Sequence, residues 1–310
     1  MKINLVLSKK NWTSFHQIAF TDLISEYFDI TYIEDHIPDK ENSILVSNLT
    51  HDRWYQDLYQ KGYKLLIDLM WGGQDFDIPD AFLLKNANWF WYHEALMYRR
   101  KGYDQYVPDR NYTKKALMPM GIHKESYDQL FDSISDLLDD FVYSYVGRLG
   151  KRLPNDAPDN FWTGDTSQLT GFNQRYFNPE WYNQTHYSLV AETTICNLFP
   201  LHLTEKTFKP IAFQHPYIIW GQQGILNHLR CLGFETYENL FDESYDMDLD
   251  RSSRLRKVVN NVRSFNYIEF DSLTNQKTKH NHQLFFNIQI IQNRIKQEII
   301  DPITDFFEKS

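Results

Sequence analysis

Residues 187–221, YSLVAETTICNLFPLHLTEKTFKPIAFQHPYIIWG, contain two apolar runs separated by a segment with helical signals. The runs Tyr187–Ala191 and Tyr217–Trp220 have the length of buried strands, and Thr204–Phe213 between them begins with a residue type that caps helices. A further helix is expected over Gly224–Leu232. Strands that alternate with helices are typical of parallel sheets whose faces are covered. This stretch therefore predicts an α/β fold.

The first part of the chain shows the same alternation. Strand-like runs occur at Lys2–Leu7, Ile30–Ile33, Ser43–Val46, Lys64–Leu69 and Trp89–Tyr92, with helix candidates such as His51–Gln60 between them. Because both halves carry the pattern, we expect two Rossmann-like parallel-sheet domains that face a cleft, where ligands of such proteins bind.

A boundary between these domains is indicated near residue 139. The polar segment Lys124–Asp139 precedes the apolar run Phe141–Val146, and GRLGKRLPNDAPDN, rich in Gly, Pro, Asn and Asp, follows it. We therefore expect an N-terminal domain over residues 1–139 and a C-terminal domain over residues 140–310.

The C-terminal segment Gln283–Glu308 is predicted to be helical. Its apolar side chains form one stripe, made by Leu284, Phe285, Ile288, Ile291, Ile295 and Ile299. Pro302 should kink or restart this helix. We expect the helix to pack back toward the N-terminal domain.

The composition is that of a globular protein. The 310 residues are 42% hydrophobic and 24% charged, which suits two domains of about 150 residues. A net charge of -9 gives no general attraction to a polyanion, so a nucleic-acid partner is not favoured. Cys196 and Cys231 form no CxxC pair, and no window approaches the roughly 18 apolar residues of a membrane span. We expect a cytoplasmic protein without a membrane span.

Charged residues follow two of the predicted strands directly. Glu192 comes after the run that ends at Ala191, and Arg148 comes after Phe141–Val146. A carboxylate accepts hydrogen bonds from a ribose diol, and cationic side chains neutralise a diphosphate. These positions predict a site for a nucleoside diphosphate held without a metal.

The predicted helix after Glu192 adds charges at its start. Thr204 is the expected cap, Glu205 and Lys206 fall in the first turn, and Lys209 lies one turn further. Backbone N–H groups and the helix dipole favour an anion there. Each residue also has a structural explanation, since an acid at a helix start stabilises the dipole and two lysines fit a solvated face.

The order Ala191-Glu192-Thr193, then Thr204-Glu205-Lys206 opening a helix, then HPYIIWG, resembles the donor-binding core of α1,3-fucosyltransferase-like glycosyltransferases. The resemblance implies a GT-B architecture and an inverting, metal-independent transfer of a hexosyl or fucosyl group from a nucleotide sugar to a glycan or other hydroxyl acceptor, with no cofactor.

The resemblance also implies roles for single residues. Glu205 would hold the donor ribose, Lys206 the diphosphate and Arg148 the phosphates from a neighbouring strand. Thr193 and His202 replace an amide residue and a tyrosine of the family, so the donor base and sugar stay open. The implied donor site comprises Arg148, Glu192, Thr193, His202, Thr204, Glu205, Lys206 and Lys209.

A general base for the acceptor hydroxyl should come from the N-terminal domain. Asp68 lies at the end of the run Lys64–Leu69, and Glu94 is the last residue of NWFWYHE. Glu94 is slightly favoured because its aromatic neighbours would partly desolvate it. Both also suit simpler roles, Glu94 as an acid in a helix start and Asp68 as a cap.

No metal site is predicted. Asp75 and Asp77 have the spacing by which GT-A glycosyltransferases hold a divalent ion, but such triplets are common. The acidic stretch Asp242–Asp250 lacks the glycine and final glutamate of an EF-hand, and His280 and His282 lack a second ligand pair.

Three alternatives stay open. A DNA-base-modifying glycosyltransferase would need a basic groove, for which the candidates are Arg99, Arg100, Lys101, Lys114 and Lys115. A GT-A enzyme would use Asp75 and Asp77 to hold a divalent ion. A non-catalytic nucleotide-sugar-binding protein would bind the donor without turnover.

Overall fold

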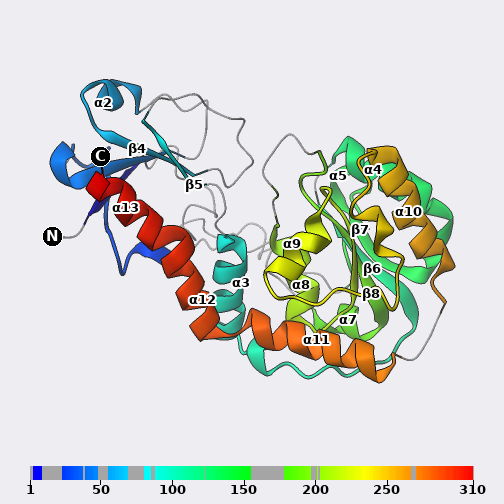
Figure 1. The fold of residues 1–310 in the computed structure, drawn as a ribbon. Coiled ribbons are helices and arrows are strands. Elements are labelled where there is room, and N and C mark those ends of the chain that lie inside the picture. Colours follow the sequence, from blue (N-terminus) through cyan, green and yellow to red (C-terminus); the bar gives the residue numbers. More distant parts are fainter. Residues whose placement is uncertain are drawn as a thin grey trace.

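The two parallel sheets predicted from the sequence are present. The computed structural model describes residues 3–8, 23–37, 39–47, 55–68, 80–84, 88–121, 123–154, 178–196, 201, 203–266 and 270–309. One sheet has five strands in the order β2-β1-β3-β4-β5, and the other has four in the order β7-β6-β8-β9 (Figure 1). Every neighbouring pair is parallel. The predicted α/β class, with two parallel sheets and a C-terminal helix, is confirmed.

The strands of both sheets follow apolar runs. The first sheet contains β1 (Asn4–Leu7), β2 (Asp29–Tyr32), β3 (Ser43–Ser47), β4 (Lys64–Asp68) and β5 (Phe82–Leu84). The second contains β6 (Lys114–Met120), β7 (Phe141–Tyr145), β8 (Thr185–Ala191) and β9 (Tyr217–Trp220). Every residue of β8 and β9 is buried, as expected for strands covered on both faces.

Helices cover the two faces of the second sheet. Figure 1 shows α8 (Glu205–Ala212) and α9 (Ile225–Cys231) on one side of it, and α4 (Glu125–Ser133) and α10 (Arg251–Ser264) on the other. The remaining helices are α2 (Gln56–Gln60), α3 (Trp89–Arg100), α5 (Val146–Leu149), α7 (Pro179–Asn183), α11 (Ser272–Phe285), α12 (Ile288–Ile295) and α13 (Asp301–Lys309). No helix of the described ranges is both long and apolar enough to cross a bilayer.

The strand predicted at Trp89–Tyr92 is wrong, because these residues begin helix α3. A short apolar run does not distinguish a buried strand from a buried helix. In α3 the buried face recurs at helical spacing, with Trp91, Ala95 and Tyr98 all fully buried. The fifth strand of the first sheet is β5 instead, at residues 82–84.

The chain passes from the first sheet to the second before β6. Strand β6 is hydrogen-bonded to β7 on one side and β8 on the other. The predicted domain boundary near residue 139 would place β6 in a different domain from β7 and β8, the two strands to which it is hydrogen-bonded. Strand β6 is not predicted from the sequence, because its apolar run is short and contains Pro119.

The C-terminal helices connect the second sheet to the first. Helix α12 continues through a π-helical turn, η7 (Lys296–Ile300), into α13, whose first turn contains Pro302. The backbone stays helical on both sides of Pro302, so the proline does not interrupt the helix, and the change from π-helical to α-helical hydrogen bonding falls there instead. Phe306 stacks on Phe82 with ring centroids 5.2 Å apart, and Lys64 donates to the Phe307 carbonyl oxygen. Helix α13 thus packs on the first sheet (Figure 1).

Glu298 of η7 joins elements of both parts of the chain. Its carboxylate accepts a hydrogen bond from the Asn88 amide at 3.2 Å and one from the Tyr92 hydroxyl, and it pairs with Arg294 at 3.0 Å. His228 of α9 lies 3.1 Å from the Asn88 side-chain oxygen. Burial and then the charge of Glu298 raise the pKa of Tyr92, which keeps its proton for this bond.

Replacing Glu298 with alanine should lower the free energy of unfolding by about 2 to 4 kcal/mol, because several part-buried donors lose their acceptor. Urea denaturation of the purified variant measures this. Glu308→Ala, an exposed change on α13, is the control and should cost less than about 0.5 kcal/mol. Equal effects of the two changes would show that the Glu298 network does not stabilise the protein.

Candidate functional site

Glu192 ties the end of β8 to the start of α8. The carboxylate is fully buried and accepts four hydrogen bonds: from the Thr193 amide at 3.0 Å, the Thr204 amide at 3.1 Å, the Thr204 hydroxyl at 2.6 Å and the Thr207 hydroxyl at 2.6 Å. All its acceptor positions face the protein's own donors. The structure therefore gives Glu192 a positioning role, beside the donor contact predicted for it.

Thr204 caps α8, as predicted. Its backbone is extended, its hydroxyl oxygen accepts from the Lys206 amide at 3.3 Å, and the same hydroxyl donates to Glu192. This cap fixes the first turn, so that Glu205 and Lys206 stand directly beyond the carboxyl end of β8.

The close passage of β9 explains the glycine that ends HPYIIWG. A Cβ atom at Gly221 would lie 2.9 Å from Cδ1 of Ile225 and 3.4 Å from Cβ of Glu192. The chain leaving β9 thus passes directly beside Glu192, and a side chain at Gly221 would disturb the junction of β8 and α8.

Glu205 and Lys206 form an ion pair at this helix start. Nζ of Lys206 lies 2.8 Å from Oε1 of Glu205, and it donates to the Thr193 hydroxyl at 2.9 Å. The Glu205 side chain is 7% exposed and that of Lys206 is 23% exposed. Burial alone would lower the pKa of Lys206, but the charges of Glu205 and Glu192 outweigh it and raise the pKa. Lys206 is thus a permanently charged, partly accessible cation.

Lys124 is a second cation at this place and was not among the predicted site residues. It precedes α4, just beyond the end of β6, and its Nζ donates to the Thr193 carbonyl oxygen at 3.0 Å. The same ammonium lies 5.5 Å from the ring centroid of Tyr127. A lysine shortly after an apolar run was the available signal, but β6 had not been predicted as a strand.

Arg148 is engaged with acidic residues of α4. It lies in α5, immediately after β7, and its guanidinium is 3.1 Å from Asp128 and 2.7 Å from Asp132. Its side chain is 34% exposed. The structure brings Glu192, Thr193, Thr204, Glu205 and Lys206 together and gives Arg148 partners of its own. A contact between Arg148 and a phosphate remains a prediction.

Two predicted residues of the donor-binding site remain to be placed, Lys209 and His202. Lys209 is in the last turn of α8 and half-buried. His202 lies outside the described residues.

The two candidate bases differ in position. Asp68 is the last residue of β4, and its register partner Leu84 ends β5, so it lies at the carboxyl edge of the first sheet. Glu94 belongs to α3 and not to a strand exit, is fully buried, and has Nδ1 of His93 at 3.8 Å. Of the two, only Asp68 has the strand-end position expected of a base.

The dismissed metal motifs have structural roles where the structure describes them. Asp242 caps a helical turn, Asp250 caps α10, and His280 and His282 lie in α11. No group of three potential ligands occurs among the described residues. Asp75 and Asp77 lie outside them.

The basic residues proposed for a DNA groove are partly engaged within the protein. Lys115 is buried, Lys114 donates to the Asp139 carbonyl oxygen at 2.6 Å, and Arg99 lies 3.7 Å from Asp104. Lys115, being buried, cannot contribute to such a groove.

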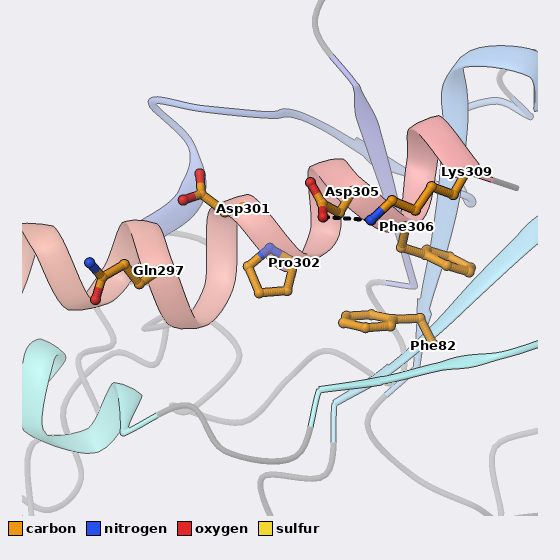
Figure 2. Close-up of a pocket in the computed structure, with 7 residues that line it drawn as sticks. All are labelled: Phe82, Gln297, Asp301, Pro302, Asp305, Phe306 and Lys309. Atoms are coloured by element: carbon orange, nitrogen blue, oxygen red, sulfur yellow. Dashed lines mark hydrogen bonds and ion pairs between the residues drawn. The ribbon is translucent and has the colours of Figure 1, made fainter.

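A groove lies between α13 and the amino end of β5. Figure 2 shows its lining: Phe82, Gln297, Asp301, Pro302, Asp305, Phe306 and Lys309. Phe82 is the first residue of β5, whereas Asp68 pairs with the last. The groove thus opens at the other end of β5 from the one where the acceptor is expected.

Comparisons with known proteins give structural matches only. No protein-family model and no curated protein matches the sequence. The chain is similar to a crystal structure of alpha1,3-fucosyltransferase, with a TM-score of 0.45 and 11% identity over 93% of this chain and 91% of the other. The complex with GDP-fucose gives 0.43 and 12% over 94% and 90%, and the complex with GDP gives 0.42 and 11% over 93% and 92%. The function must therefore be inferred from the site itself.

Proposed function

We propose that the protein is a glycosyltransferase that moves a sugar from a nucleoside-diphosphate sugar to an acceptor hydroxyl. One observation carries the proposal: Lys206 is held beside buried Glu205 at the start of α8, directly beyond the carboxyl end of β8. A fixed cation at a helix start suits a phosphate, and a neighbouring carboxylate suits a ribose diol.

We infer a metal-independent reaction, in which direct attack of the acceptor would invert the anomeric carbon. When the acceptor oxygen attacks the anomeric carbon, negative charge develops on the departing diphosphate. Lys206 is already in place and charged, so it stabilises this charge without reorganisation. The positive charge that a divalent ion would supply thus comes from the side chain.

The donor base can be identified by thermal shift. GDP, UDP, ADP, CMP and TDP are each added to the protein with and without Mg²⁺. A ligand at 100 times its dissociation constant adds about 2.7 kcal/mol, which raises the melting temperature by a few degrees. One nucleotide should stabilise the protein without Mg²⁺, and the matching nucleotide sugar should then be consumed. Binding without consumption of any matching sugar would identify a non-catalytic binding protein, and binding only with Mg²⁺ would favour the GT-A alternative.

Asp68→Asn should reduce turnover by about 100-fold or more while leaving donor affinity unchanged, because a general base contributes about that factor. Initial-rate kinetics with the identified donor, together with direct binding of the nucleotide, separate the two effects. Glu94→Gln is the parallel variant. A loss of turnover in Glu94→Gln with an active Asp68→Asn would assign the base to α3 instead.

A further inference from the structure

The segment after β8, residues 193–196, is held by side chains from distant elements. Arg254 of α10 donates to the Ile195 carbonyl oxygen at 2.9 Å, and Gln222, which follows β9, donates to that of Cys196 at 3.1 Å. The segment forms neither helix nor strand. Because it lacks regular backbone hydrogen bonds, these side chains fix its path.

Arg254 joins this segment to a second loop. The residue is 2% exposed, and its guanidinium also donates to the Asp248 carbonyl oxygen at 2.9 Å, in the loop that precedes α10. The guanidinium carbon lies 5.7 Å from the ring centroid of Trp220, the last residue of β9. A guanidinium is a rigid, planar fork of donors, so Arg254 sets the two loops in a fixed relation at the end of the sheet.

The surroundings of Arg254 do not compensate its charge fully. Burial lowers the pKa of Arg254, and its buried Nε has no hydrogen-bond acceptor among the described residues. Taking a charge out of water costs free energy, which two hydrogen bonds to neutral carbonyl oxygens offset only in part. The contribution of Arg254 therefore lies in the loop positions that it fixes.

The segment held by Arg254 contains Thr193, which orients Lys206. Nζ of Lys206 donates to the Thr193 hydroxyl at 2.9 Å, in addition to its ion pair with Glu205. Ile195 is two positions from Thr193, so a shift of Ile195 would displace this hydroxyl. Lys206 would then lose one of the bonds that hold it in place, and ordering it again when a nucleotide binds would cost affinity.

We propose that Arg254 is a positioning residue of the donor site: by holding Ile195, it keeps Thr193 and Lys206 in the geometry that binds the nucleotide. This inference rests on the proposed function, since it concerns the same nucleotide. Because Arg254 is almost fully buried, it acts without touching the ligand. Its effect should therefore fall on the affinity for the donor and not on the affinity for the acceptor.

The test is calorimetric titration of Arg254→Lys with the nucleoside diphosphate that stabilises the wild type. A lysine keeps the charge, but its single ammonium cannot replace the fork that reaches both carbonyl oxygens. The variant should bind the nucleotide about 3- to 10-fold more weakly, because one side chain must be ordered on binding. The KM for the nucleotide sugar should rise by a similar factor, and the KM for the acceptor should not change.

Arg110→Lys is the matched control. The Arg110 guanidinium also donates to backbone carbonyl oxygens, those of Tyr182 at 2.8 Å and Gln214 at 2.6 Å, and burial lowers its pKa as well. Tyr182 and Gln214 precede β8 and β9, so Arg110 lies at the amino edge of the second sheet, opposite the donor site. Arg110→Lys should lower the melting temperature, as Arg254→Lys does, but leave the nucleotide affinity unchanged.

The outcomes separate this inference from the proposed function. If the wild type binds a nucleotide and folded Arg254→Lys binds it equally well, Arg254 has no positioning role and the proposed function stands. Equal weakening by the two arginine variants would also overturn the inference, because it would reflect a general loss of stability. If the wild type binds no nucleotide, the proposed function fails together with the inference.

Hydrogen exchange without ligand gives a second readout. Exchange of the amides in residues 193–196 should be faster in Arg254→Lys than in the wild type and unchanged in Arg110→Lys. Unchanged exchange in Arg254→Lys would show that Arg254 does not hold the segment. If melting temperatures show that Arg254→Lys is unfolded, Arg254→Gln replaces it with the same criteria, since glutamine still donates one hydrogen bond without a buried charge.

Discussion

Replacing Lys206 with alanine should abolish the stabilisation by a nucleoside diphosphate. Hydrogen bonds to a charged group contribute about 1.5 to 3 kcal/mol each, so affinity should fall by roughly 10- to 100-fold or more. At a ligand concentration that shifts the wild type by a few degrees, the variant should then show almost no shift. Thermal shift and calorimetry both measure this loss.

The control for Lys206→Ala is Lys257→Ala. Lys257 also forms an ion pair, 3.0 Å from Asp248, but it lies on α10 and is not part of the site. This variant should bind nucleotide as the wild type does. Lys206→Ala also leaves Glu205 buried without its cation, so melting temperatures without ligand must be compared. Unchanged nucleotide affinity in Lys206→Ala would place the donor elsewhere.

Glu192→Ala should lower the free energy of unfolding by about 3 to 5 kcal/mol. Two hydroxyls and two backbone amides would lose one shared acceptor in the interior, and each unsatisfied buried donor costs about 1 to 3 kcal/mol before relaxation. Glu192→Gln should cost less, because one amide oxygen still accepts. Chemical denaturation of both variants gives the values.

Asp305→Ala provides the comparison for Glu192→Ala. Asp305 belongs to an exposed ion pair with Lys309 at 2.8 Å, and such pairs contribute about 0 to 1 kcal/mol. A loss at Glu192 no larger than the loss at Asp305 would contradict the positioning role of the buried carboxylate.

The strand and helix order of residues 187–221 could be predicted because each signal there is local. Strand β9 occupies the predicted residues, and Thr204 caps α8 as its sequence position indicates. The strand prediction for Trp89–Tyr92 failed because four consecutive apolar residues are compatible with a buried strand and with a buried helix. The packing of α3 against distant helices determines that these residues are helical. The Trp91 indole, for example, donates to the Phe285 carbonyl oxygen at 3.0 Å.

The site was only partly accessible from the sequence. Glu205 and Lys206 follow their helix cap, so sequence position alone brings them to the end of β8. Lys124 lies far from them along the chain and joins them only because β6 is inserted between β7 and β8. Such an order depends on tertiary packing and cannot be obtained from neighbouring residues. The four hydrogen bonds to Glu192 were also missed, although the most distant donor is only 15 positions away along the chain.

The return of α13 to the first sheet affects how the chain folds during synthesis. Lys64 and Phe307, which are hydrogen-bonded, are 243 positions apart. Strands β6 to β9 and their helices lie between these two positions and can assemble as soon as they leave the ribosome. Until α13 has been made, Phe82 of the first sheet lacks the Phe306 ring on which it stacks. Closing so long a loop is slow when the intervening chain is unstructured, and the folded second sheet shortens it.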